Sequence, residues 1–433
     1  MQKQTEAILI EPTLVIEDRE ELIFLLSEAA ALEHMVMCEY LFAHFSLKQD
    51  TSEGLTPEQL VAVKRWKKIV SEVAGQEMLH LTLASNLLTA LGAAPSFERP
   101  NFPQRAKYYP DSFPMALMPF SETALEYFLV LERPEDLTPQ DAVLFETNTQ
   151  EQHVPFLAAT NGNSITPVSQ DFATVGHLYR GIENGFRTLV EKYGESKVFI
   201  GPPSAQVTSQ YYAWPDLVAV TDLASAIKAI ETIVEQGEGS RGHREDSHYG
   251  KFLDVLTEYR SLKQQDPDFE PARPAIPAFV KLPADITDAT LITDPLTADI
   301  AALFNVSYEI ILQMLTCVYI HDYETDNEIK LLSRTSVGTM FMINLPLGEL
   351  LTTLPVGPEY PGKTAGASFE IFRTSYILPH RDAAWAILRE RLLEMADYCD
   401  RISGPPSVHS VLAAAGQAAR RLAGGLVLPK GEN

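Results

Sequence analysis

The sequence predicts an all-α protein: a four-helix bundle with long crossover loops, followed by a second helical region. Two stretches, 20–47 and 58–91, contain no proline and carry apolar residues at helical spacing. Two Glu-x-x-His motifs occur, at 77–80 and 245–248, and each follows a candidate glutamate-bearing helix. A proline-rich segment, 263–295, then separates this part from further helical patterns. Together these observations give the order of helices that a four-helix bundle needs.

The first helix is predicted to run from Asp18 to about Leu47. Asp18 and Glu21 resemble a capping box, which marks a helix start. The stretch is apolar almost all round, as is typical of a central bundle helix. Glu33 interrupts this apolar run and is the favoured candidate for a buried carboxylate. Glu39, on a different face, is the alternative.

The second helix begins at 56–59, with Thr as N-cap, Pro at the first position and Gln at the third. It is predicted to end at Gly92, a typical C-cap residue. Glu77 and His80 are three positions apart, so they share one helix face, and their neighbours are largely apolar. A buried carboxylate and imidazole are costly unless both are paired. A divalent metal ion is one partner that pairs with both.

The connection 93–120 is rich in proline and aromatic residues, which predicts a long ordered crossover. Loops of this length often cover a functional site. A helix is expected at 121–132, an irregular segment at 133–170, and a second Gly/Pro/aromatic connection at 194–215.

The third bundle helix is predicted at 171–193, with Glu183 as its interior glutamate. His177 is the alternative ligand on this helix. It lies six positions before Glu183, so the two do not share a face. An ordinary, partly buried histidine is the favoured interpretation of His177.

The fourth bundle helix is expected to be split by a Gly-rich break between 221–236 and 245–262. Either Glu235 or Glu245 could supply its carboxylate. The spacing to His248 favours Glu245, because a glutamate at a helix end beside a glycine turn is usually solvated.

This pattern matches that of di-iron carboxylate bundles, in which two helices each give Glu-x-x-His and two others each give one glutamate. A mixed carboxylate and imidazole site suits Fe(II) or Mn(II) and needs no thiolate. We therefore expect one or two non-haem iron ions, or manganese. The predicted metal ligands are Glu33, Glu77, His80, Glu183, Glu245 and His248.

Composition excludes several classes of partner. The net charge of −24 and the pI near 4.8 argue against nucleic acids and anionic membranes, which bind Lys/Arg clusters. Three scattered cysteines give no disulfide framework, so a reducing cytoplasm is the expected compartment. The N-terminus lacks the apolar region of a signal peptide, and no membrane span is expected. A small-molecule substrate is the expected partner.

Three parts are predicted: a metal-binding bundle at 1–262, a Pro-rich linker at 263–295 and a C-terminal helical domain at 296–433. The C-terminal part would be a second, metal-free bundle or the contact face of a homodimer. Its expected helices cover 296–322, 324–354, 380–402 and 411–425.

Several motifs resemble those of one family. They are Leu32-Glu33-His34 and Tyr40-Leu41-Phe42-Ala43 in the first helix, Gln76–Leu81 in the second, Arg99-Pro100-Asn101-Phe102-Pro103 and Glu132-Arg133-Pro134 in the crossover, and Gln236–Gly239 followed by Ser247-His248-Tyr249. From about Glu20 to Leu262, the chain resembles the ferritin-like family related to iminophenyl-pyruvate dimer synthase. Its best-known members are longer iron proteins of bis-indole pigment and alkaloid biosynthesis, which oxidatively couple two imines made from tryptophan.

The resemblance implies a ferritin-like bundle with a non-haem iron site carried by Glu33, Glu77, His80 and His248. Glu183 and Glu245 follow from the bundle pattern instead. His177 stands where the family commonly has an acidic residue, so the choice between His177 and Glu183 stays open. Tyrosines near these positions are interpreted as core side chains with hydrogen-bonded hydroxyls.

The expected function is that of a non-haem iron oxidase or oxygenase acting on a small metabolite, such as one derived from an aromatic amino acid. An iron-binding module without a substrate and a metal-free helical scaffold are the alternatives.

Overall fold

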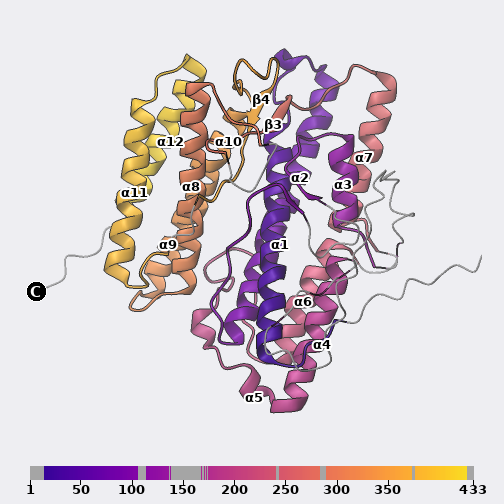
Figure 1. Cartoon of the computed structure of the whole chain (residues 1–433), viewed down its shortest axis with the longest axis vertical. Helices are drawn as coiled ribbons and strands as arrows, with labels where there is room; N and C mark the ends of the chain where they lie inside the picture. Colours follow the sequence, from indigo (N-terminus) through magenta and orange to yellow (C-terminus); the bar gives the residue numbers. More distant parts are fainter. Residues whose placement is uncertain are drawn as a thin grey trace, which may run out of the picture.

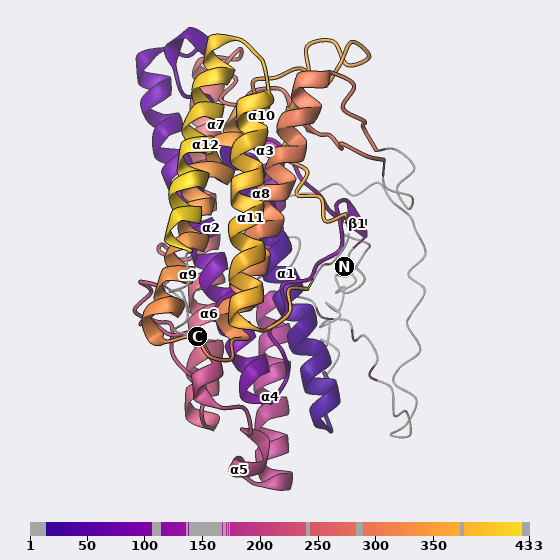
Figure 2. The same ribbon diagram turned by 90° about the vertical axis from the view of Figure 1, so that its left-hand side faces the viewer.

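The computed structural model describes residues 14–105, 114–135, 137, 167, 170, 172, 174–239, 243–282, 289–372 and 376–426. The chain is mostly helical, which confirms the predicted fold class. Two helical bodies lie side by side, with α8 to α12 packed along one side of α1 and α2 (Figure 1). Turning the molecule by 90° places α8, α11 and α12 in front of the bundle (Figure 2).

Two long helices form the centre of the N-terminal body: α1 (Arg19–Ser46) and α2 (Pro57–Ala90). Their predicted starts are confirmed. Asp18 accepts a hydrogen bond from the amide of Glu21, and Thr56 and Gln59 form a capping box. Gly92 follows the end of α2 with φ of +88°, a conformation that favours glycine.

The other two bundle positions are each built from two shorter helices that meet end to end. One pair is α3 (Glu122–Leu131) and α4 (Val175–Tyr193); the other is α7 (His248–Gln265) and α6 (Leu223–Gly237). α3 packs on α7 beside one half of the α1–α2 pair, and α4 packs on α6 beside the other half (Figure 1). The predicted break in the fourth position is confirmed, and the third position is broken as well. The four free helix ends therefore meet at the middle of the bundle.

The C-terminal body contains α8 (Pro295–Tyr319), α11 (Arg381–Arg401) and α12 (Pro406–Gly425). Between α8 and α11 the chain forms one continuous helical rod, made of α9 (Asp326–Thr339), a π-helical turn (Met340–Asn344) and α10 (Leu345–Leu351). By length and composition, α8 is the one helix among the described residues that could cross a membrane, but 67% of its most apolar window is buried.

The remaining elements are short. They are α5 (Glu195–Val198), the 3-10 turns Thr51–Glu53 and Pro203–Ala205, and the strands β1 (Gln104–Arg105), β2 (Pro114–Met115), β3 (Ala275–Pro277) and β4 (Thr364–Gly366). β1 pairs with β2 antiparallel, and β3 pairs with β4 in parallel. The second pairing ties the Pro-rich linker to the C-terminal body.

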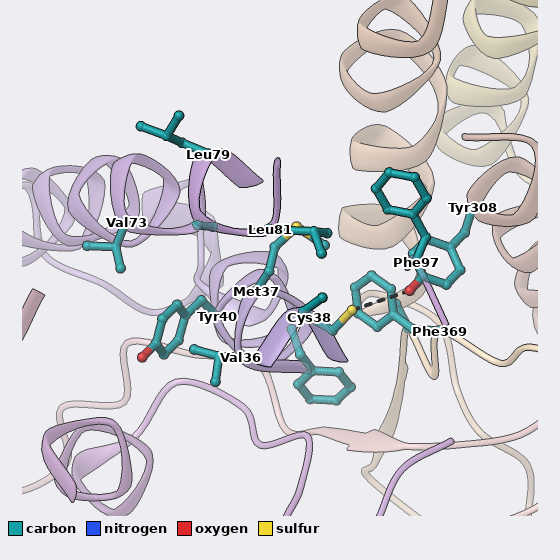
Figure 3. Packing of buried hydrophobic residues seen from close by; sticks show 14 of the residues in the cluster. Val36, Met37, Cys38, Tyr40, Val73, Leu79, Leu81, Phe97, Tyr308 and Phe369 are labelled. Atoms are coloured by element: carbon teal, nitrogen blue, oxygen red, sulfur yellow. Dashed lines mark hydrogen bonds between the residues drawn. The ribbon is translucent and has the colours of Figure 1, made fainter. Parts of the chain in front are cut away.

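α1 is buried on opposite faces, which accounts for its nearly all-round apolar sequence. Figure 3 shows Cys38 directed toward Tyr308 of α8, whereas Tyr40 points to the other side of the helix. The Cys38 Sγ lies 3.6 Å from the Tyr308 hydroxyl, which is also 2.6 Å from His34 Nε2. The crossover residue Arg99 donates to the same hydroxyl at 3.0 Å. α1 therefore belongs to the core of both bodies.

Two glycines allow the bodies to approach closely. A Cβ atom on Gly348 of α10 would lie 2.5 Å from the ring of Phe45, and one on Gly366 would lie 2.1 Å from the ring of Phe42. Both rings are buried, and Phe45 packs against Phe304 with ring centroids 6.1 Å apart. The rings cannot move aside without disturbing this cluster.

We expect Gly348→Ala to lower the free energy of unfolding by about 1–3 kcal/mol, because the added methyl group overpacks the contact with Phe45. The matched control is Gly424→Ala in α12, where a Cβ atom has nothing within 4 Å. That control should raise stability by up to about 1 kcal/mol, because alanine favours the helix. Urea unfolding of both variants measures the difference. Equal effects of the two substitutions would contradict close packing at Gly348.

Candidate metal centre

Glu77, in the middle of α2, lies at the centre of a buried cluster of acids and histidines. Its side chain is 2% exposed. One carboxylate oxygen lies 3.0 Å from His80 Nδ1, and the other lies 2.8 Å from His248 Nδ1. The two imidazole rings are stacked, with centroids 5.4 Å apart. Glu77 therefore bridges two histidines that are 168 residues apart in the sequence (248 − 80).

The first group of candidate ligands is Glu33, Glu77 and His80. Glu33 comes from α1, and its Oε2 lies 3.7 Å from His80 Nδ1. All three residues are buried, and one ligand atom from each falls within 4.8 Å of the others. The spacing of Glu77 and His80 on one helix face, predicted from the sequence, is what places both in this group.

The second group is Glu77, Glu132 and His248, with the same close spacing and full burial. Glu132 is the C-cap residue of α3, and its Oε1 lies 3.4 Å from His248 Nδ1. His248 is the first residue of α7, after the N-cap Ser247. The ends of the two broken bundle positions thus supply Glu132 and His248, and the unbroken α2 supplies Glu77.

Glu33 and Glu132 are the outer carboxylates, each of which belongs to only one of the two groups. Each accepts a hydrogen bond from a tyrosine. The Tyr179 hydroxyl of α4 donates to Glu33 Oε1 at 2.7 Å, and the Tyr40 hydroxyl of α1 donates to Glu132 Oε1. Burial raises the pKa of both phenols well above the ordinary value, and the neighbouring carboxylates raise them further. Both tyrosines therefore stay protonated and act as hydrogen-bond donors.

The last turn of α6 forms another side of the centre. Gln236 Oε1 lies 3.1 Å from His80 Nε2. Glu238 is buried and accepts hydrogen bonds from the amides of Gly176 and Glu135, at 2.7 and 3.2 Å. A Cβ atom on Gly176 would lie 2.3 Å from the Glu238 carboxylate, so a glycine here lets that carboxylate lie against the first turn of α4.

A small cavity opens beside the first group. Glu33, Glu77, His80, Glu132 and Glu238 line it, together with apolar side chains of α1, α3, α4 and α6 and two glycines. It has room for about one or two water-sized molecules.

Burial and the close charges shift the protonation of the cluster. Burial opposes the charged form of Glu77, but His248 and His80 outweigh it and lower the pKa well below the ordinary value. Burial likewise opposes protonation of His80, but Glu77 and Glu33 raise its pKa to about 10. Burial raises the pKa of Glu33 to about 7. It also raises the pKa of Glu238 to about 7, with Glu135 adding to the shift.

The cluster has the composition and the unsatisfied atoms that a metal site requires. Both ring nitrogens of His248 are buried and make no well-aligned hydrogen bond with the described residues, although Nδ1 is close to Glu77. Such orphaned buried polar atoms are rare in native proteins unless a ligand or ion satisfies them. Oxygen and imidazole donors suit iron or manganese. The two groups share Glu77, so the residues present could hold one or two such ions.

The structure brings together Glu33, Glu77, His80 and His248, four of the predicted ligands. Their role as metal ligands stays a prediction. Glu39, the alternative on α1, is buried on another face and accepts from the Tyr127 hydroxyl at 3.0 Å.

The structure does not bring Glu183 to this cluster, and its predicted interior position is wrong. Its side chain is 23% exposed and pairs with Arg187, one turn further along α4, at 2.6 Å. His177, the alternative, is buried in the first turn of α4, but belongs to neither group of the described residues. The third bundle position contributes Glu132 instead, from the end of α3.

Glu245 is also misplaced by the sequence pattern. Ser247 caps α7 by accepting from the amide of Gly250, so the helix begins at His248 and Glu245 precedes it. The helical i, i+3 relation therefore does not apply, and Glu245 is exposed. Glu235 is exposed as well. The buried carboxylate of this segment is Glu238, which lies in the Gln236–Gly239 motif.

A family model described as Ferritin-like matches residues 26–257, more than half of the chain. The chain belongs to the ferritin-like family. The match includes both groups of candidate ligands, with all of α2 and α3 and most of α1 and part of α7.

This ferritin-like chain is similar to two curated proteins along most of its length. It is 27% identical over 424 residues to dichlorochromopyrrolate synthase of Lentzea aerocolonigenes, covering 88% of this chain and 39% of that protein. It is 26% identical over 410 residues to 2-imino-3-(indol-3-yl)propanoate dimerase of Chromobacterium violaceum. This similarity covers 88% of this chain and 37% of that protein. The chain thus spans less than two fifths of the length of either relative.

Among solved structures, a ferritin-like protein from Caulobacter vibrioides is similar, with a TM-score of 0.43 and 19% identity. The similarity covers 70% of this chain and 87% of that one.

We expect Glu132→Gln to reduce the metal bound by this ferritin-like protein by about one ion per chain, because the second group loses an anionic ligand. Elemental analysis after reconstitution measures the loss. Glu183→Gln is the matched control and should retain the full metal content. Loss of metal in Glu183→Gln but not in Glu132→Gln would show that Glu183, and not Glu132, is the ligand.

Metal binding should release protons at neutral pH. In the metal-free protein His80 is protonated, because its pKa is raised to about 10. A metal ion at Nδ1 must displace that proton. Apparent affinity should therefore rise with pH, by about tenfold per pH unit for each released proton, and level off near pH 10. Calorimetric Mn(II) titrations in two buffers of different ionisation enthalpy measure the proton count. Buffer-independent heats would contradict the protonated state of His80.

Proposed function

We propose that this chain is a metal-dependent oxidase or oxygenase that uses a pair of non-haem iron ions and acts on a small metabolite. The observation that carries the proposal is the pair of buried Glu/His groups that share Glu77 and face a cavity. Three carboxylates and two imidazoles buried close together are costly by themselves, and divalent cations would balance them.

Glu33, Glu77, Glu132, His80 and His248 would hold the ions. Iron bound there would supply redox chemistry with dioxygen or peroxide that carboxylates and imidazoles cannot perform alone. Tyr179 holds Glu33 Oε1 and so leaves Oε2 toward His80, whereas Tyr40 holds Glu132 by Oε1, the oxygen that also faces His248. Both hydrogen bonds fix the orientation of a carboxylate.

Glu238 has a proton-handling role in this proposal. It lines the cavity without belonging to either ligand group of the described residues, and its pKa of about 7 leaves it half protonated near neutral pH. A carboxyl group with these properties can donate or accept a proton beside the reacting molecule. The amides of Gly176 and Glu135 hold the carboxylate in place as the proton moves.

The relatives support a substrate class. One is named for chlorinated chromopyrrolate synthesis and the other for dimerisation of an indole imine. We extend this to an imine or related metabolite derived from an aromatic amino acid, coupled or oxidised by this chain. The cavity as it stands suits dioxygen or peroxide better than an indole ring, so an aromatic substrate would react at its mouth or after the cavity widens.

The first test is the metal content of the purified chain after expression with added iron. We expect about two irons per chain, and we expect His80→Ala combined with His248→Ala to abolish binding. Added Fe(II) should also raise the melting temperature of the metal-free protein, because a ligand of the native state stabilises it. Near-zero iron without a thermal shift would reject the proposal in favour of a metal-free scaffold.

The second test addresses the reaction. The iron-loaded chain is supplied with the imines that an amino-acid oxidase forms from tryptophan, tyrosine and phenylalanine. Dioxygen consumption and coupled products are then measured. Product that depends on both His80 and His248 supports the proposal. Iron oxidation without any organic product would identify an iron-binding module instead.

A further inference from the structure

The two ligand groups form a matched pair, which makes any difference between them informative. Each has one outer carboxylate fixed by a buried tyrosine, shares Glu77, and presents the Nδ1 atom of a buried histidine. The candidate ligand atoms alone therefore predict two metal positions of similar affinity.

The distal nitrogens of the two histidines differ. His80 Nε2 has the amide oxygen of Gln236 at 3.1 Å. His248 Nε2 is buried and has no hydrogen-bond partner among the described residues. A histidine that binds metal through Nδ1 must carry its proton on Nε2. His80 can donate that N–H to Gln236, whereas the N–H of His248 stays unsatisfied, which is costly in a core.

We infer that the two positions bind metal with unequal affinity, and that Gln236 is the positioning residue that makes the Glu33–Glu77–His80 position the tighter one. A distal acceptor fixes the tautomer and the ring orientation and increases the basicity of the ligating nitrogen. This inference rests on the proposed function, because it requires that both groups bind metal.

Helix ends do not decide the difference. His248 lies at the N-terminus of α7, whose partial positive charge disfavours a nearby cation. Glu132 lies at the C-terminus of α3, whose partial negative charge favours one. These effects oppose each other at the same position, so the contact between His80 and Gln236 remains the main asymmetry.

The asymmetry has a functional consequence. His80 lines the cavity with Glu33, whereas His248 is not among the described residues that line it. Glu132 of the second group and the shared Glu77 also line it. The tighter position would therefore be the one whose histidine and unshared carboxylate both border the cavity, whereas the weaker position borders it through carboxylates alone. A centre built in this way retains its reactive ion when metal is scarce.

The test is an anaerobic titration of the metal-free full chain with Co(II), followed by visible absorption and native mass spectrometry. We expect two steps that differ in affinity by at least about tenfold. His248→Ala should remove the weaker step and leave the tighter one. His80→Ala should remove the tighter one.

Gln236→Leu keeps the side-chain volume but removes the acceptor. It should lower the Co(II) affinity of the tighter step by about 10–100-fold and leave that of the weaker step unchanged. The two affinities should then be closer to each other. Gln236→Glu restores an acceptor and should keep the steps apart, an outcome that a merely structural role would not produce. Glu235→Leu, at the exposed neighbouring position, is the matched control and should leave both steps unchanged.

Circular dichroism of the metal-free variants verifies folding, and Gln236→Ala replaces Gln236→Leu if the latter does not fold. Equal affinities in the wild type, or an unchanged first step in the acceptor-free variant, would overturn the inference alone. No cobalt uptake by the wild type would overturn the proposed function with it, so the two failures are distinguishable.

Discussion

Charge balance around the buried carboxylate of Glu77 is the constraint on which the rest of the structure depends. A carboxylate that is 2% exposed cannot rely on water, and both of its oxygens face an imidazole at about hydrogen-bond distance. The same contacts raise the pKa of His80 and lower that of Glu77, so each group holds the other in its charged form. Glu33 and Glu132 add further negative charge to the same volume. The core thus gathers carboxylates and imidazoles whose charges a bound cation could help to balance.

This requirement explains why two bundle positions are broken. A continuous helix offers side chains only from its lateral face, whereas a helix end also exposes unpaired backbone groups. Here the end of α3 supplies Glu132, the start of α7 supplies His248, and the end of α6 supplies Gln236 and Glu238. The amide of Gly176, in the first turn of α4, satisfies the Glu238 carboxylate. The breaks place four helix ends around the centre, beside the unbroken α1 and α2.

The C-terminal body supports the centre from the opposite side of α1. His34, the neighbour of Glu33 in sequence, contacts Tyr308 of α8, and Arg99 of the first crossover donates to the same hydroxyl. The close contacts of Gly348 and Gly366 with Phe45 and Phe42 extend this packing along the helix. The Arg-Pro-Asn-Phe-Pro motif of the crossover therefore contributes to the contact between the bodies and not to the ligand set. Asn101 adds to that contact by pairing with the backbone of Ile371 at 2.8 and 2.9 Å.

The sequence by itself determined the elements whose signals are local. Apolar periodicity and caps defined α1 and α2, and the i, i+3 spacing within α2 placed Glu77 and His80 on one buried face. The apolar surroundings of Glu33 identified it correctly as a buried acid. Only the tertiary structure could decide the rest, because the other partners meet end to end across long connections. Glu132 and Glu238 reach the centre through the relative placement of α3, α4, α6 and α7, which no periodicity encodes. Glu183 was expected inside the bundle from its position in the third helix alone, and Glu245 was expected in a helix beginning at 245, whereas α7 begins at His248. Glu183 lies on the partly exposed side of α4, where it pairs with Arg187, and the Ser247 cap leaves Glu245 outside α7.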